Sequence, residues 1–297
     1  DVFIRKFSSN GTPVWCTYYG GSDEDRGGRI YCDRFANLYI TGFTLSPNNI
    51  ATSGSFSSTY SLQTFSFFSK FNSNGIRLWG SYYPAYISSI KNDLQDNVYI
   101  AGFVGIDTGI ATSGAHQITR GGGNDGFITK FNSSGNRVWG TYLGGLDDDI
   151  IWDLDIDVHN SVFVSGITKS TNNISTLGSF QQVFGGIADN FIAKFNSSGV
   201  RQWGTYYGGV EDEEHITCNV VDTSGNLFFI GEAQSPNIFA TPGAFQMGTS
   251  TWGGDYCLAK FNTNGQRIWG TYFDGNGDDW ITDLKVDSHG NPVFTGY

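Results

Sequence analysis

The sequence predicts an all-β fold, a five-bladed β-propeller of four-stranded blades that occupies residues 1–297 as a single domain. The first observation behind this prediction is a phrase of Lys-Phe, an Asn- or Ser-rich turn with Gly, and a Trp. It occurs five times, at Trp15, Trp79, Trp139, Trp203 and Trp269. The second is its period of 60 to 66 residues, which suits one small sheet per repeat. The third is that apolar residues alternate along short segments, as they do in half-buried strands.

Four strand signals follow one another in each repeat, and we order them from the propeller axis outward. In one repeat they span residues 151–157, 161–166, 189–195 and 203–206. The innermost strand ends on Asp, the second ends on Gly, the third contains Lys-Phe, and the outermost begins at Trp. Asn or Asp and Gly stand between the first and second strands and between the third and fourth. These residues predict tight hairpins, because such turns require positive φ.

The two ends of the chain together supply the fifth blade. The chain starts with a third strand at residues 1–7 and stops after a second strand at residues 291–297. Joining them in one sheet would remove the open edges that a row of strands otherwise exposes. The sequence therefore predicts a ring closed by a composite blade from the N- and C-terminal strands.

Composition and charge exclude several classes of function. The 39% hydrophobic content of 297 residues allows a large core, and 41 glycines with 16% aromatic residues suit short strands and tight turns. The formal net charge of −11 and the absence of a basic stripe argue against nucleic acid and anionic membranes. Cations, neutral sugars and basic proteins remain as partners. No apolar run of about 18 residues predicts a membrane helix, so we expect no direct membrane insertion.

The four cysteines show no spacing typical of a metal site. Cys16, Cys32, Cys218 and Cys257 stand at strand positions where other repeats carry small or apolar residues. We expect them to be buried free thiols that act as small hydrophobic groups.

Four segments of the repeat are similar to a known family pattern. They are residues 203–209 (Trp-Gly-Thr-Tyr-Tyr-Gly-Gly), 225–231 (Gly-Asn-Leu-Phe-Phe-Ile-Gly), 241–246 (Thr-Pro-Gly-Ala-Phe-Gln) and 189–195 (Asp-Asn-Phe-Ile-Ala-Lys-Phe). With them the chain resembles the SBBP-type bacterial β-propeller repeat over essentially its whole length. The resemblance implies a propeller of exported or surface-attached bacterial proteins, often one module of a longer chain, with no shared catalytic motif. The second repeat departs from the pattern, with Tyr-Tyr-Pro-Ala at residues 82–85.

Acidic loops connect each outermost strand to the next innermost strand, on the face of a propeller that usually binds ligands. Counting back from the Asp that ends each inner strand places four acids at one equivalent position, and Ala85 at that position in the remaining blade. We expect the four carboxylates to converge at the mouth of the axis, where Ca²⁺ is a candidate ligand. The alternative is that they are solvated loop acids or cap backbone N–H groups. The four acids are Asp25, Asp149, Glu214 and Asp279.

Aromatic residues offer a second kind of site on the same face. Phe56, His116, Phe180 and Phe245 recur once per repeat in the loops from second to third strand, which favours a packing role over sugar stacking. Aromatic residues that do not repeat are better candidates, because the fold alone does not require them. The candidate ligand-binding residues are Trp152, Trp280, His215, Tyr86 and Trp252.

These patterns predict a non-catalytic binding or adhesion module of an exported or cell-surface bacterial protein. We expect it to recognise a glycan or another surface protein through its acidic loop face. One alternative is a structural spacer without a ligand. Another is a glycosidase that uses Asp153 and Asp283 on inner strands, with Asp149 and Asp279 at the mouth. Repeat-equivalent carboxylates argue against catalysis, since an acid and a base need different environments.

Overall fold

The computed structural model describes residues 1–213, 217–249, 255–273, 275 and 280–296. In these residues the chain forms twenty strands and no helix, so the predicted all-β class is confirmed. Consistently, the described residues contain no helix of the length and apolarity that crossing a membrane requires.

Four antiparallel sheets of four strands follow one another along the chain, and we call them blades 1 to 4. Blade 1 contains β3 (Asp25–Cys32), β4 (Leu38–Thr44), β5 (Ser66–Phe71) and β6 (Arg77–Tyr83); blade 2 contains β7 (Tyr86–Asn92), β8 (Val98–Val104), β9 (Asp125–Phe131) and β10 (Arg137–Leu143). Blade 3 contains β11 (Asp149–Ile156), β12 (Val162–Thr168), β13 (Asp189–Phe195) and β14 (Arg201–Tyr207); blade 4 contains β15 (Cys218–Val221), β16 (Leu227–Glu232), β17 (Tyr256–Phe261) and β18 (Arg267–Phe273).

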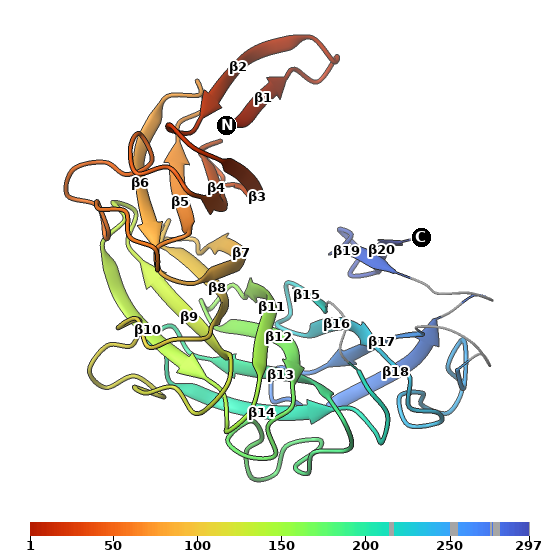
Figure 1. Cartoon of the computed structure of the whole chain (residues 1–297). Helices are drawn as coiled ribbons and strands as arrows, with labels where there is room; N and C mark the ends of the chain where they lie inside the picture. Colours follow the sequence, from red (N-terminus) through yellow and green to blue (C-terminus); the bar gives the residue numbers. More distant parts are fainter. Residues whose placement is uncertain (214–216, 250–254, 274, 276–279, 297) are drawn as a thin grey trace.

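Two further pairs of strands flank the blades. The N-terminal hairpin is β1 (Val2–Phe7) with β2 (Pro13–Tyr19), and the C-terminal hairpin is β19 (Ile281–Val286) with β20 (Pro292–Gly296). The first strands of successive sheets contact one another in the order β3, β7, β11, β15, β19. Figure 1 shows these five inner strands arranged around a common centre, with the outer strands at the periphery.

The composite blade is the part of the prediction that the structure does not form. The N- and C-terminal hairpins are separate two-stranded sheets, and β1 and β20 share no ladder. Figure 1 shows an open arc, with the two termini facing each other across the opening. Four-stranded sheets are therefore confirmed, and closure into five blades is not.

The tryptophan of the repeat joins each blade to the next. The Nε1 of Trp139 donates a hydrogen bond to the Ser197 carbonyl in the turn of blade 3, at 3.0 Å. The indole lies over Gly199 of that turn, which has a φ of +79° as its hairpin requires. The same hydrogen bond is donated to the carbonyls of Ser73, Ser133 and Thr263 by Trp15, Trp79 and Trp203, respectively.

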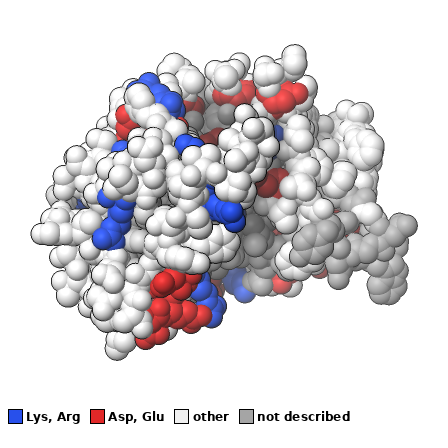
Figure 2. All heavy atoms as spheres, turned by 90° about the horizontal axis from the view of Figure 1, so that it is seen from above, with Lys and Arg blue, Asp and Glu red and all other residues white. Residues whose placement is uncertain are grey.

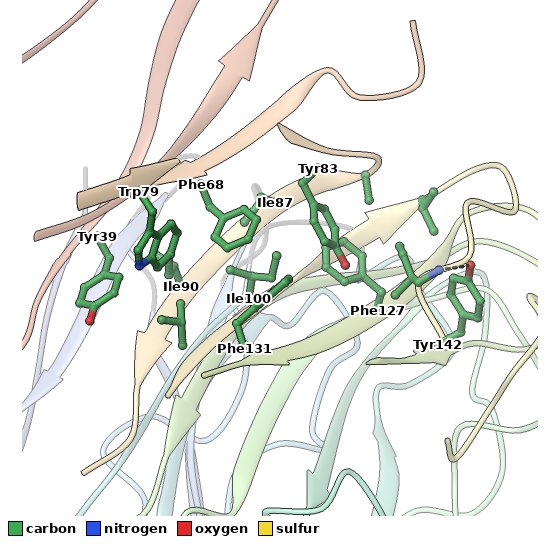
Figure 3. Packing of buried hydrophobic residues seen from close by; sticks show 14 residues of the cluster. Tyr39, Phe68, Trp79, Tyr83, Ile87, Ile90, Ile100, Phe127, Phe131 and Tyr142 are labelled. Carbon is green, nitrogen blue, oxygen red and sulfur yellow. Dashed lines mark hydrogen bonds between the residues drawn. The ribbon is translucent and has the colours of Figure 1, made fainter. Parts of the chain in front are cut away.

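Apolar side chains fill the space between adjacent blades. Figure 3 shows the cluster between blades 1 and 2, where Phe68 and Tyr83 lie against Phe127 and Phe131. The rings of Phe68 and Phe131 have centroids 4.6 Å apart, and those of Tyr83 and Phe127 are 5.1 Å apart. The core of the protein therefore lies between adjacent blades.

The cysteine prediction is correct for half of the residues. Cys218 and Cys257 are buried free thiols, whereas Cys16 and Cys32 are free but exposed. Cys16 lies on the N-terminal hairpin, and Cys32 ends the first inner strand, where it lines a pocket together with residues of that hairpin.

Candidate functional site

The five inner strands surround an axial cavity of about 280 Å³. Its polar lining comes from all five of them, although the arc is open. The lining residues that carry charge or hydrogen-bonding groups are Arg29, Ser89, Lys91, Asp153, Cys218, Asn219, Thr282, Asp283 and Lys285.

Strand alternation explains which residues reach the axis. Each inner strand ends at an Asp that caps the following turn, as Asp157 does by accepting from the His159 and Ser161 amides. Positions two and four residues before that Asp lie on one face of the strand. The outer parts of the repeat stay constant, but these positions change from blade to blade. In the five inner strands, the position four residues before this Asp is occupied by Arg29, Ser89, Asp153, Cys218 and Asp283.

Asp153 is held by neighbours on both sides of its strand. Its carboxylate accepts from the Ser89 hydroxyl at 2.8 Å and from the Asn219 amide at 3.1 Å. Burial raises the pKa of Asp153. These bonds connect three successive inner strands, so Asp153 positions the wall of the cavity.

Cations line the cavity beside these acids. Lys91 lies 3.4 Å from Asp155, and although burial lowers its pKa, the nearby carboxylates of Asp155 and Asp153 hold it above its usual value. Arg29 donates from Nε to the Ser88 carbonyl at 3.1 Å, and Lys285 pairs with Asp283. The cavity therefore offers hydrogen-bond donors and acceptors and charges of both signs.

An aromatic cluster of Tyr86, Phe103 and Trp152 lies beside the cavity. The rings of Tyr86 and Phe103 are stacked, with centroids 4.9 Å apart, and Trp152 contacts Phe103 edge-on at 5.9 Å. Trp152 is the extra residue of a β-bulge directly before Asp153, which connects the cluster to the cavity. Tyr86 is 44% exposed, so one face of the cluster is open to solvent.

The predicted ligand-binding residues are thus partly brought together. Tyr86 and Trp152 share the aromatic cluster through Phe103, which the sequence analysis did not single out. Trp280 is partly exposed and precedes β19, at the position equivalent to Tyr86. His215 and Trp252 lie outside the described residues.

Two of the predicted metal ligands have other partners. Asp149 is buried and accepts from the Gly145 amide at 2.7 Å, the Ser170 hydroxyl at 2.8 Å and the Thr168 hydroxyl. Asp25 has the equivalent bonds from Gly21, Thr44 and Ser46. Each carboxylate closes the loop of its own blade, which fits the capping alternative.

The equivalent acid in blade 4 is Glu213, one residue before the predicted Glu214. Glu213 is buried four residues after Gly209, as Asp149 is after Gly145, and it accepts from the Gly209 and Ser235 amides. The inner-strand count was wrong by one residue here. Glu214 and Asp279 lie outside the described residues. Among the residues that the structure describes, no group of three or more His, Cys, Asp or Glu could hold a metal ion.

Comparison with known proteins adds likenesses of low identity. No family model matches the chain. The uncharacterized WD repeat-containing protein L264 of Acanthamoeba polyphaga mimivirus is 23% identical over 373 residues, which cover 100% of this chain and 26% of that protein. The chain therefore spans about a quarter of the length of that curated relative.

Solved structures share the fold only loosely. A protein of unknown function from Dyadobacter fermentans has a TM-score of 0.46 at 7% identity, covering 93% of this chain and 76% of that one. A PL25 ulvan lyase has a TM-score of 0.45 at 10% identity, over 87% and 58%. BamB from Moraxella catarrhalis has 0.33 at 11%, over 96% and 86%. The chain itself is a propeller-like, repeat-built all-β protein.

Proposed function

We propose that this chain is a non-catalytic binding module that recognises a neutral glycan at the axial cavity and the adjoining aromatic cluster. In this proposal it belongs to an exported or cell-surface protein and forms a closed propeller of five blades. The observation that carries the proposal is the variation at the axis. Residues there differ from blade to blade, while the Lys-Phe, turn and Trp segments of the outer strands recur in each repeat.

The chemistry of the site suits a sugar. Sugar hydroxyls both donate and accept hydrogen bonds, and Lys91, Ser89 and Asp283 supply both functions at the cavity. Apolar faces of sugar rings pack against aromatic rings, and Tyr86 presents one to solvent. The cavity lies near the lower end of the roughly 300–1,000 Å³ range of small-molecule sites. We therefore expect one terminal sugar unit to enter it.

Charge favours a neutral ligand over an acidic one. The net charge is −11, and on the side of the molecule shown in Figure 2 the Lys and Arg residues are scattered and form no continuous stripe. An acidic polysaccharide or nucleic acid would be repelled at long range.

The surroundings of the inner carboxylates support binding over hydrolysis. A glycosidase needs one carboxyl group as acid and another as base or nucleophile. Asp153 already accepts from Ser89 and Asn219, and Asp283 is paired with Lys285.

A glycan array in calcium-containing buffer, repeated with chelator, tests the proposal. We expect selective binding to neutral glycans and a loss of roughly tenfold in affinity, about 1.4 kcal/mol, for Trp152→Ala and for Tyr86→Ala. Leu177→Ala is the matched control, because Leu177 is an exposed loop residue of blade 3 away from the axis. Absence of glycan binding by the wild-type protein in both buffers would favour the spacer alternative. Unchanged binding by both variants would place the binding site elsewhere.

A further inference from the structure

The two ends of the arc expose apolar residues whose equivalents are buried in every complete blade. On β1, Phe3 is 71% exposed and Phe7 is 52% exposed. Their equivalents on β5, Phe67 and Phe71, are 0% and 2% exposed. The same sequence position is thus a core position four times and a surface position once.

We propose that the N-terminal hairpin is the partner of the free edge of β20, so that β1 pairs with β20 and completes a fifth sheet. This inference rests on the proposed five-bladed architecture and deepens it by fixing the register and contacts of the seam. In blade 1 the second and third strands pair Leu38 with Phe71 and Tyr39 with Lys70. The equivalent register pairs Pro292 with Phe7 and Val293 with Lys6.

An ion pair that occurs in blades 2, 3 and 4 has both of its equivalent residues at the seam. The third-strand Lys of a blade lies beside the Asp that ends its inner strand, at 3.5 Å for Lys130 and Asp93 and 3.7 Å for Lys194 and Asp157. In the composite blade the corresponding residues are Lys6 and Asp287. Lys6 already donates to the Ser73 carbonyl of the next blade, as Lys130 donates to Ser197. Closure supplies its second partner.

The tryptophan contact points to the same arrangement. Trp203 lies over Gly265 of the next turn, and Trp269 is the next tryptophan in the series. The turn that would follow it around the ring belongs to the N-terminal hairpin. There Gly11 has a φ of +82°, and no atom lies within 4 Å of where its Cβ would be. The space above Gly11 therefore fits the Trp269 indole.

The loop aromatic of blade 4 also lacks its partner. Phe56 packs against Phe131 of the next blade, and Phe180 packs against Phe261 of the next, with centroids 5.5 and 5.9 Å apart. Phe245 is the equivalent residue of blade 4 and is 83% exposed. Its partner by equivalence is Phe7, which is the same exposed residue that the strand register brings to this seam.

The occupant of this edge is the chain's own hairpin and not a second copy. Figure 1 places the N- and C-terminal hairpins on the two sides of one opening. Arg29 of β3 and Asp283 of β19 already line the same axial cavity. Both inner strands beside the gap thus already contribute to one cavity, which favours closure within one molecule.

Disulfide trapping tests the seam and its register. Lys6→Cys with Val293→Cys places two thiols directly opposite, in a Cys16→Ser and Cys32→Ser background that removes both exposed thiols. Arg5→Cys with Val293→Cys is the control, because neighbouring residues of a strand point to opposite faces. After mild oxidation we expect an internally crosslinked monomer from the first pair and at least tenfold less from the control.

The other outcomes each overturn the proposal. Crosslinked dimers would show that a second copy covers the edge, equal crosslinking by both pairs would refute the register, and none by either would refute the seam. If the cysteine variant does not fold, exchanging the two charges of the proposed Lys6–Asp287 ion pair tests the seam instead. Lys6→Asp and Asp287→Lys should each lower the melting temperature. The double variant, which exchanges the two charges, should recover at least half of the summed loss in melting temperature. The same recovery is expected for the control exchange of Lys194 and Asp157. The proposal is overturned if the losses in melting temperature simply add for Lys6→Asp with Asp287→Lys while the exchange of Lys194 and Asp157 recovers stability.

The glycan array is read separately on the crosslinked monomer. A crosslink without glycan binding would refute the proposed function and leave the seam intact. Glycan binding without a crosslink would do the reverse.

Discussion

Replacement of Gly199 by Ala tests whether the Trp–Gly contact holds neighbouring blades together. Gly199 has a φ of +79°, where an L-residue costs about 1–2 kcal/mol. An added Cβ would also lie 2.9 Å from the Trp139 ring, well inside the usual contact of about 3.5–4.0 Å. Moving the indole would strain or break its bond to the Ser197 carbonyl, which contributes about 1 kcal/mol. We expect a total loss of about 2–4 kcal/mol in the free energy of unfolding.

Gly225→Ala is the matched control for the backbone contribution. Gly225 has the same φ of +79°, but the nearest atom to an added Cβ is 3.8 Å away, on Thr263. We expect it to cost only about 1–2 kcal/mol. Urea unfolding followed by circular dichroism measures both variants, and a Trp139→Ala background should reduce the cost of Gly199→Ala to that of the control. Equal losses for the two glycine variants in the wild-type background would refute the reasoning.

Two further predictions concern buried ionisable groups. Burial raises the pKa of Asp149 to about 7, above the roughly 3.9 of an unfolded chain, so its contribution to stability is complete below about pH 4 and is lost as the pH rises through 7. We expect Asp149→Asn to flatten the fall in melting temperature between about pH 4 and 8, whereas Asp147→Asn, at an exposed position of the same loop, should leave it unchanged; equal slopes would contradict this. Burial raises the pKa of Cys218 to about 12 and that of Cys257 still further, so a maleimide at neutral pH should label Cys16 and Cys32 quickly and the other two only after unfolding. Fast labelling of all four thiols in the native protein would contradict the described burial.

Local chemistry made the strands and turns predictable from the sequence. The Asn-Ser-Ser-Gly turn beginning at Asn132 recurs because its side chain accepts from the Ser134 and Asn136 amides and Gly135 supplies a φ of +80°. The Asp at the end of each inner strand is recognisable for the same reason, since it accepts from the backbone amides of the turn that follows it, as Asp157 does from His159 and Ser161. Such features repeat wherever the same turn is built, so one sequence reveals them.

Equivalent positions in the loops were harder to predict, because a single inserted residue shifts the spacing between a loop residue and the strand that follows. The distance from Trp to the inner-strand Asp is 18 residues from Trp139 to Asp157 but 19 from Trp203 to Asp222. Counting back from Asp222 therefore reaches Glu214, while the buried acid Glu213 is fixed by its bonds to Gly209 and Ser235. Counting forward from the Gly-Gly pair would have found it. Bonds across a loop decide such a position, and spacing from one end does not.

Asp153 and Asp283 could be placed on inner strands from the sequence, but the other axial residues could not be recognised, because their partners lie on other blades. Lys91 reads as one of several charged strand residues until the structure places it 3.4 Å from Asp155 of the next blade. The alternation that predicts the strand also predicts which residues face the axis, but not which charges meet there. Around the cavity, Lys91 forms an ion pair with Asp155, and the Ser89 hydroxyl donates a hydrogen bond to Asp153. Arg29 and the Asp283–Lys285 pair line the same cavity from the two inner strands beside the opening, so the step that closes the fold would also close the wall of the site.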